Sequence, residues 1–356
     1  MSTIRANTIQ DASGGSNAVL LGVASPPNSM GFRNRIINGD MRIDQRNAGA
    51  VSSGYSVDRW ACFNNITAKA TLQKSTVAPA GFAASLLITS TSAYTVAAGE
   101  VAGASQSIEG FNVADLAWGT VSASSATLSF WVRSSLTGQF GGAVRNSNGT
   151  QSYPFAFTVN AANTFECKTV TISGPTSGTW ATDNTTGIAI VFSAGAGSSL
   201  KGTAGVWSTA SLADATGSNS LVGTSGATFY ITGVQLEAGT VATPFERRPY
   251  GAELALCQRY YWKNTSGHIT SAWGSLYTTT GGRVWRSFPV PMRADPSLSV
   301  NTNVFDLIGY GSVTGTVANV ITESTAVSFD GIGLSLSGFA GQPFTYSRSF
   351  EVSAEL

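Results

Sequence analysis

The stretch from Ala227 to Tyr261 decides the fold: A-T-F-Y-I-T-G-V-Q-L-E-A-G-T-V-A-T-P-F-E-R-R-P-Y-G-A-E-L-A-L-C-Q-R-Y-Y. It begins as a β-pattern, passes through a turn marked by prolines, and ends as a short helical pattern. Leu254, Cys257 and Tyr261 recur at i, i+3 and i+7, which gives the helix an apolar interface. Because the surrounding sequence is β-rich, this change of period marks the end of a domain.

A helical connector is predicted over residues 251–265. Pro249 and Gly251 mark its start, and the polar run Asn264–Gly267 marks its end. After it, residues 266–356 return to the β-pattern in a smaller C-terminal tip domain.

Before the helix, residues 36–250 read as a succession of short strands. Apolar positions such as Leu128, Phe130 and Val132 alternate with more polar neighbours, and so do Ile188 and Phe192. No helix-length periodic segment lies between the strands, which argues against a parallel α/β fold. The sequence therefore predicts an all-β fold, an antiparallel jelly-roll β-sandwich followed by the helix and the C-terminal β domain.

Residues 1–35 form an N-terminal arm with few apolar positions, among them Ile4, Ile9, Leu20 and Leu21. Ordering a residue costs about 1–2 kcal/mol of backbone entropy, which this segment cannot offset by burying its own side chains. We therefore expect the arm to be extended and held by a neighbouring chain, so these four residues are predicted to serve anchoring or oligomerisation.

Charge excludes several partners. Charged residues make up 11% of the 356 residues, against roughly 25% in ordinary soluble domains, and the net charge is +1. A chain without a basic field is not expected to bind nucleic acid. We also expect no membrane insertion and no secretory signal, since the sequence shows no long apolar run, and hence assembly in the cytoplasm of the producing cell.

The three cysteines are Cys62, Cys167 and Cys257. They are widely spaced, odd in number and without a C-x-x-C pair, so neither a disulfide framework nor a zinc site is predicted. Buried free thiols are the expectation for all three.

Catalysis is not expected. His268 is the single histidine and lies in a Gly-Ser-Thr-rich stretch, which disfavours Ser-His-Asp, Cys-His and multi-histidine metal sites. Glycan hydrolysis needs only two carboxylates, so the sequence leaves a depolymerase open as a minor alternative.

Sugar binding is the chemistry that the composition favours. Aromatic rings offer flat apolar faces to pyranose rings, and the chain holds 8 Trp and 10 Tyr. Most of them are expected in the core. The glycan-binding candidates are those in turn-rich surroundings, namely Trp118, Trp180, Trp273, Tyr277, Trp285 and Tyr310.

Several strings of residues carry a family resemblance. They are S-T-I-R-A-N-T-I-Q-D (2–11), R-I-I-N-G-D-M-R-I-D-Q-R (35–46), Y-S-V-D-R-W (55–60), G-V-Q-L-E-A-G (233–239), P-F-E-R-R (244–248) and E-L-A-L-C-Q-R-Y-Y (253–261). In this order they resemble tailed-bacteriophage tail fibres and related virion structural proteins, in which a jelly-roll carbohydrate-binding-module-like domain precedes a distal segment. The resemblance spans most of the first 261 residues.

The resemblance implies a virion fibre protein. It would be a homotrimer attached to other tail proteins by its N-terminal arm, with a distal β tip that recognises a host cell-surface glycan during adsorption. A non-receptor virion structural protein, such as a head decoration, head fibre or tail component, is the alternative.

Similar jelly-roll modules often hold a structural calcium ion between an early loop and the last strand. By resemblance, Asp40 and Glu237 occupy those positions, and carboxylate oxygens suit this ion. In the other interpretation, Asp40 caps a turn and Glu237 pairs with an arginine such as Arg42 or Arg46. No other cofactor is expected.

Overall fold

The computed structural model describes residues 33–264, 273–278, 281–300, 304–307, 311–314, 317–321, 329–337 and 350–356. Asn34–Leu356 forms one compact unit. The predicted anchor residues Ile4, Ile9, Leu20 and Leu21 lie outside the described residues, so their role stays a prediction.

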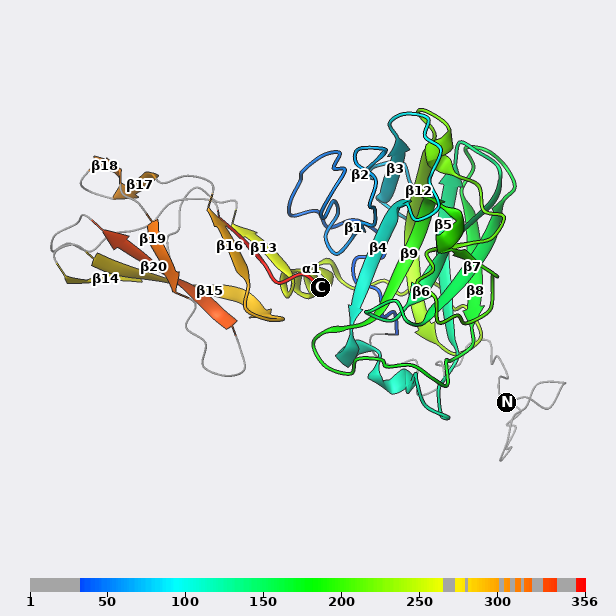
Figure 1. Cartoon of the computed structure of the whole chain (residues 1–356). Helices are drawn as coiled ribbons and strands as arrows, with labels where there is room; N and C mark the ends of the chain where they lie inside the picture. Colours follow the sequence, from blue (N-terminus) through cyan, green and yellow to red (C-terminus); the bar gives the residue numbers. More distant parts are fainter. Residues whose placement is uncertain are drawn as a thin grey trace, which may run out of the picture. The chain divides into compact units, whose positions relative to one another are not determined.

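Two five-stranded sheets form a sandwich (Figure 1). The first sheet has the order β1 (Ala61–Cys62), β4 (Val101–Glu109), β9 (Thr186–Ala196), β6 (Gly138–Arg145) and β7 (Ser152–Val159). The second has the order β2 (Ala70–Ser75), β3 (Ser85–Ser90), β12 (Thr228–Ala238), β5 (Ala126–Ser134) and β8 (Glu166–Ile172).

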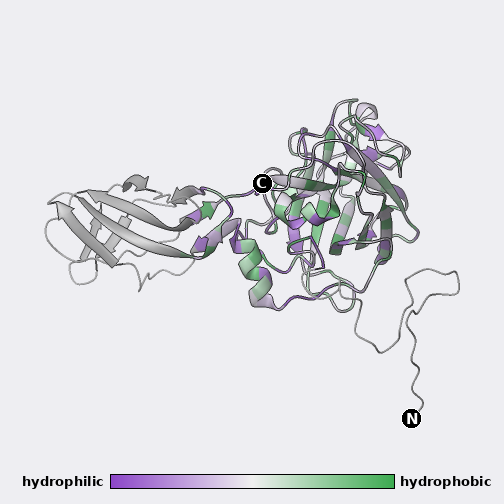
Figure 2. Cartoon of the chain, turned by 90° about the horizontal axis from the view of Figure 1, so that it is seen from below, coloured by the Kyte–Doolittle hydropathy of each residue, from purple (hydrophilic) through white to green (hydrophobic). Residues whose placement is uncertain are grey.

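The alternation in the sequence sends every second side chain between the two sheets. Ile188, Ile190 and Phe192 of β9 are at most 1% exposed, and they meet Phe130 of β5, whose ring centroid lies 5.0 Å from that of Phe192. Burying a side chain of this size contributes about 1.5–3 kcal/mol. Along the strands, hydrophobic and hydrophilic residues alternate, as expected of a sheet that buries one face and exposes the other (Figure 2).

The connections make the sandwich a jelly roll. β12 lies between β3 and β5, and β9 lies between β4 and β6, so neighbours in a sheet are distant in sequence. Every strand pair within these two sheets is antiparallel. The predicted antiparallel jelly-roll sandwich is confirmed.

Smaller elements complete the chain. Short 3₁₀ turns lie at Gly110–Asn112, Ala114–Leu116, Ser198–Leu200 and Leu221–Gly223. A parallel pair joins β10 (Lys201–Gly202) and β11 (Asp214–Ala215), and the helix α1 spans Tyr250–Gln258. Among the described residues, no helix is long and apolar enough to cross a membrane.

The C-terminal strands belong to small antiparallel sheets. One has the order β13 (Tyr261–Asn264), β21 (Phe350–Ser353) and β16 (Ser297–Val300). Another has the order β14 (Trp273–Thr278), β15 (Gly281–Met292), β20 (Phe329–Ser337) and β19 (Val317–Ile321), and a hairpin joins β17 (Val304–Leu307) to β18 (Gly311–Thr314).

Helix α1 is shorter than the sequence predicts. It ends at Gln258, because Tyr261 is already the Cα partner of Ser353 in the β13–β21 pair. Cys257 is fully buried in a small apolar cluster and Leu254 packs at the edge of that cluster, as expected of a helix interface. Tyr261 was expected on the same interface, but it is a strand residue and its ring faces the guanidinium of Arg46 at 3.6 Å.

The resembling strings that lie within the described residues, from residue 35 onward, meet in space, and we call their contact region the motif junction. Asn38 links three of them: its side-chain amide donates to the carbonyl oxygens of Ile43 and Asp58, and its backbone N–H donates to the carboxylate of Glu253 in α1. Gly39 belongs to it as well, since a Cβ there would lie 2.2 Å from the carbonyl oxygen of Val234.

Buried arginines hold the motif junction together. Arg59 is 1% exposed, pairs with Glu355, donates to the Ser107 carbonyl oxygen at 2.6 Å, and lies 3.6 Å from the ring centroid of Tyr260. Arg46 contacts the other carboxylate oxygen of Glu355 at 3.1 Å. The resembling strings therefore include side chains that join the sandwich, α1 and the last described residues.

The three cysteines are free. Cys257 is buried and Cys62 is half-buried, but Cys167 is exposed. The expectation of a buried thiol at Cys167 is wrong, because this residue lies on the outward register of β8, opposite Trp131 of β5.

Candidate functional site

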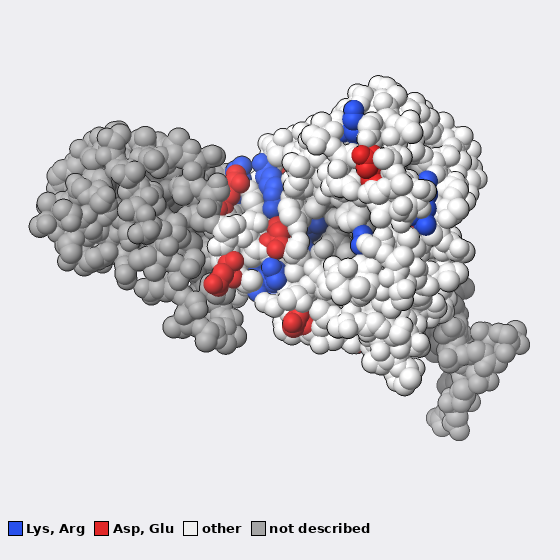
Figure 3. Space-filling view, in the orientation of Figure 1, with Lys and Arg blue, Asp and Glu red and all other residues white. Residues whose placement is uncertain are grey.

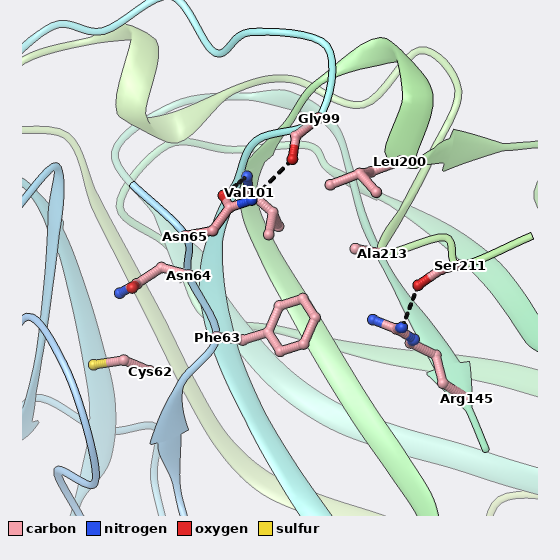
Figure 4. Close-up of a pocket in the computed structure, with 10 residues that line it drawn as sticks. All are labelled: Cys62, Phe63, Asn64, Asn65, Gly99, Val101, Arg145, Leu200, Ser211 and Ala213. Carbon is pink, nitrogen blue, oxygen red and sulfur yellow. Dashed lines mark hydrogen bonds between the residues drawn. The ribbon is translucent and has the colours of Figure 1, made fainter. Parts of the chain in front are cut away.

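A pocket of about 410 Å³ opens on the outer face of the first sheet. Most of this face carries no charged residues, and Lys or Arg atoms lie within its hollow (Figure 3). The lining residues, drawn in Figure 4, are Cys62, Phe63, Asn64, Asn65, Gly99, Val101, Arg145, Leu200, Ser211 and Ala213.

The floor of the pocket is apolar because of strand alternation. While the inward side chains of β4 and β9 fill the core, the outward side chains of Val101 and Val191 form a second apolar cluster with Ala213. Phe63 and Leu200 pack against this cluster and remain partly exposed. A small apolar surface thus persists on the outside of the sheet, bordered by polar groups.

One wall is the segment that follows β1. The backbone N–H of Phe63 donates to the Gly103 carbonyl oxygen at 2.9 Å, and that of Asn65 donates to the Val101 carbonyl oxygen at 3.1 Å. The side chain of Asn65 reinforces this pairing, since it accepts from the Val101 N–H and donates to the Gly99 carbonyl oxygen, both at 2.8 Å. The backbone that carries Phe63 is therefore held in place by hydrogen bonds within the protein.

Arg145 stands on the opposite side, at the end of β6. Its guanidinium donates to the hydroxyl of Ser211 at 2.5 Å and lies 5.4 Å from the ring centroid of Phe63. The two side chains point toward one another across the pocket (Figure 4). Burial lowers the pKa of the Arg145 guanidinium, which nevertheless stays charged at neutral pH.

The turn after β6 leaves room for that guanidinium. Gly149 has a φ of 70°, and a Cβ on it would lie 2.3 Å from Nη2 of Arg145 and 2.8 Å from the hydroxyl oxygen of Ser211. Glycine satisfies both the left-handed backbone and the close approach. The turn geometry and the position of Arg145 are thus coupled.

This arrangement suits a small polyhydroxylated ligand. Phe63 supplies an aromatic face for the apolar side of a sugar ring, while Arg145, Asn64 and Ser211 supply hydrogen-bonding groups. The volume lies within the range of about 300–1,000 Å³ that small-molecule pockets occupy. Sequence reasoning missed these residues, and the available signal was an outward arginine at a strand end followed by the turn Ser147-Asn148-Gly149.

Two of the predicted aromatic candidates come together elsewhere. Trp118 and Trp180 form an edge-to-face triangle with Trp207, with ring centroids 4.9, 5.5 and 5.6 Å apart. Each indole N–H donates to a backbone carbonyl oxygen. Trp118 is 7% exposed, so its placement on the surface was wrong, and the edge-to-face packing explains why. Trp180 and Trp207 remain half-buried.

Three of the other four aromatic candidates lie in the C-terminal strands. Trp273 of β14 and Trp285 of β15 are Cα partners across their strand pair, and Tyr277 lies further along β14. Tyr310 falls outside the described residues, as does His268. A role of these aromatic residues in glycan binding stays a prediction.

The two carboxylates of the expected calcium site are engaged by protein groups. Asp40 pairs with Arg42 at 3.1 Å, whereas the second interpretation expected Asp40 to cap a turn and assigned the arginine partner to Glu237. Glu237 is 1% exposed and accepts from the N–H and hydroxyl of Thr243 and from the amide of Gln235. Among the described residues, no group of three or more His, Cys, Asp or Glu side chains converges on a metal-sized site.

Comparison with known proteins gives distant similarities in structure. No family model and no curated protein sequence matches the chain. Solved structures that are similar include tailspike protein 4 of bacteriophage CBA120 (13% identity over 58% of this chain and 22% of that chain, TM-score 0.34) and a candidate sugar-binding protein of Bacteroides thetaiotaomicron (13%, 58% and 100%, TM-score 0.36).

A family 11 carbohydrate-binding module of a Clostridium thermocellum cellulase is also similar (12% identity, 54% of this chain and 95% of that chain, TM-score 0.29). The chain thus spans about a fifth of the tailspike chain that it matches. Similarities at this level do not assign the chain to a family.

Proposed function

We propose that this chain is a virion fibre protein of a tailed bacteriophage whose β-sandwich binds a cell-surface glycan of the host. The observation that carries the glycan-binding part is the pocket over the first sheet, where Phe63 and Arg145 face one another and the polar side chains of Asn64 and Ser211 also line the pocket. The virion part rests on the strings of residues that resemble phage tail fibres and virion structural proteins.

The same proposal covers assembly. The chain would form a homotrimer, attach to other tail proteins through residues 1–35, and present the sandwich and the C-terminal strands to the cell surface. Binding would leave the glycan intact, because the described pocket lining offers no carboxylate pair of the kind that glycoside hydrolysis needs. Assembly would take place in the host cytoplasm before release.

Binding of fluorescently labelled protein to host cells, together with a glycan panel, tests the glycan-binding part. Phe63→Ala removes the aromatic face and should abolish detectable binding, whereas Phe111→Ala should not change it. Phe111 is a suitable control because its side chain is 61% exposed and does not line the pocket. Equal binding by the wild type and Phe63→Ala would contradict the proposed site.

The virion part has its own test. Gold-labelled antibodies against the protein should mark the tail fibres in electron micrographs, and purified protein should block adsorption. Labelling of the head, with no effect on adsorption, would favour the structural alternative of a head decoration or head fibre protein. Release of reducing ends from a bound polysaccharide would instead show a depolymerase.

A further inference from the structure

The pocket contains one charged side chain within the described part of the chain, that of Arg145. Its interactions are the hydrogen bond to the Ser211 hydroxyl and the contact with the Phe63 ring. Neither of these supplies a negative charge. A partly desolvated cation without a counter-charge is costly, so its presence needs an explanation.

Three other arginines of the described chain have carboxylate partners, the buried Arg59 and Arg248 and the half-buried Arg259. The pairs are Arg59–Glu355, Arg248–Glu253 at 3.2 Å and Arg259–Glu109 at 2.6 Å. No described carboxylate lies within ion-pair distance of the Arg145 guanidinium. Arg145 thus lacks the carboxylate partner that Arg59, Arg248 and Arg259 have.

Two carboxylates adjoin lining residues in sequence, but both are engaged elsewhere. Glu100 accepts from the hydroxyl of Tyr94 and from the backbone N–H of Ala97, each at 2.8 Å. Asp214 accepts from the hydroxyl of Ser193 and from the backbone N–H of Ala215, each at 2.8 Å. Neither carboxylate forms an ion pair with Arg145, and each is directed toward neutral donors.

The guanidinium is also held in place for a ligand. Ser211 anchors one of its nitrogens, and Gly149 provides the space in which that nitrogen lies. A planar guanidinium matches carboxylate and phosphate groups with two parallel donors, and its attraction for an anion increases where solvent is partly excluded.

We propose that the glycan bound in this pocket is acidic, and that Arg145 receives its carboxylate or phosphate group while Phe63 packs against the sugar ring. This inference rests on the proposed glycan-binding function and specifies its ligand. It makes Arg145 the residue that distinguishes acidic from neutral glycans.

The test is a panel of neutral glycans, uronic-acid and sialic-acid glycans and phosphate-bearing glycans, with carboxyl-reduced or dephosphorylated forms of each acidic member. Wild-type protein should bind acidic members and lose about 10- to 100-fold in affinity when the charge is removed. Arg145→Gln should lose a similar factor for the acidic form and bind the neutralised form as the wild type does. Comparison of the uronic-acid and sialic-acid glycans with the phosphate-bearing glycans decides whether the bound group is a carboxylate or a phosphate.

Arg133→Gln is the matched control. Arg133 lies on the other sheet, where it contacts the ring of Tyr230 at 4.8 Å, so its loss should not change binding. Wild-type melting temperatures would show that both variants fold, and Arg145→Lys, which keeps the charge without the planar fork, should retain part of the affinity.

The outcomes separate the two proposals. Binding of neutral glycans that Arg145→Gln leaves unchanged, but Phe63→Ala abolishes, would overturn the acidic ligand and leave the proposed function standing. Absence of binding across the whole panel and to host cells would overturn both.

Discussion

Replacing Arg59 by alanine should destabilise the protein by about 3–5 kcal/mol. The side chain is 1% exposed, and its loss leaves Glu355 buried with one cation partner, Arg46, instead of two. Breaking a buried ion pair from one side costs about 3–5 kcal/mol. The Ser107 carbonyl oxygen also loses its donor and the Tyr260 ring its cation, but these losses overlap with the first and do not add to it in full.

Arg35→Ala provides the comparison. Arg35 pairs with Asp115 at 2.6 Å, a close contact by any measure, but the Asp115 side chain is 56% exposed. An exposed pair of this kind contributes about 0–1 kcal/mol. The two arginine variants therefore remove the same chemical group from different environments, and only burial and the attached network distinguish them.

Equilibrium unfolding in urea, followed by tryptophan fluorescence, measures both variants. A double-mutant cycle with Glu355→Ala then separates the ion pair from packing, and we expect the double variant to lose clearly less stability than the two single variants together. If Arg59→Ala lies within about 1 kcal/mol of Arg35→Ala, burial of the ion pair does not govern the stability of the motif junction, and the reasoning fails.

Three further predictions concern single residues. Burial raises the pKa of Asp58 from 3.8 to about 6, so the folded protein binds this proton more tightly than the unfolded chain, and the contribution of Asp58 to stability increases as the pH falls from about 6 to 4. Between pH 7 and pH 4, the unfolding free energy of the wild type should therefore rise by on the order of 3 kcal/mol relative to that of Asp58→Asn. A difference between the two proteins that stays constant with pH would refute this. Gly39→Ala should lower the melting temperature, since its Cβ would lie 2.2 Å from the Val234 carbonyl oxygen. Gly251→Ala meets no atom within 4 Å and lies in α1, so it should leave the melting temperature unchanged or raise it slightly. Gly149→Ala should displace Arg145 and weaken glycan binding clearly, while it lowers the melting temperature only slightly. Unchanged affinity would show that the turn does not position the guanidinium.

Much of the sandwich could be predicted from local pattern. The alternation in β5 and β9 is a property of neighbouring residues, and it gave the correct inward side chains, such as Phe130 and Phe192. The end of α1 could not be predicted in the same way, because Tyr261 leaves the helical pattern to pair with Ser353, 92 residues later in the chain. Its partner strand is not visible in the local sequence.

The pocket escaped prediction for a similar reason. Phe63 and Arg145 are distant in sequence and meet only because β1 and β6 belong to the same sheet, in the order β1-β4-β9-β6. Trp118 was assigned to the surface from the turn-rich residues around it, but that segment folds back so that its ring packs against Trp180 and Trp207. Local composition predicted a turn correctly, but it could not predict which side chains the turn packs against.

A structure of the protein in complex with the glycan that binds most tightly in the panel tests the central claim most directly. The account predicts a sugar ring against Phe63, with a carboxylate or phosphate group at the guanidinium of Arg145, on the outer face of the first sheet. A sugar bound at Trp180 and Trp207, or along β14 and β15, with the pocket left empty, would contradict it.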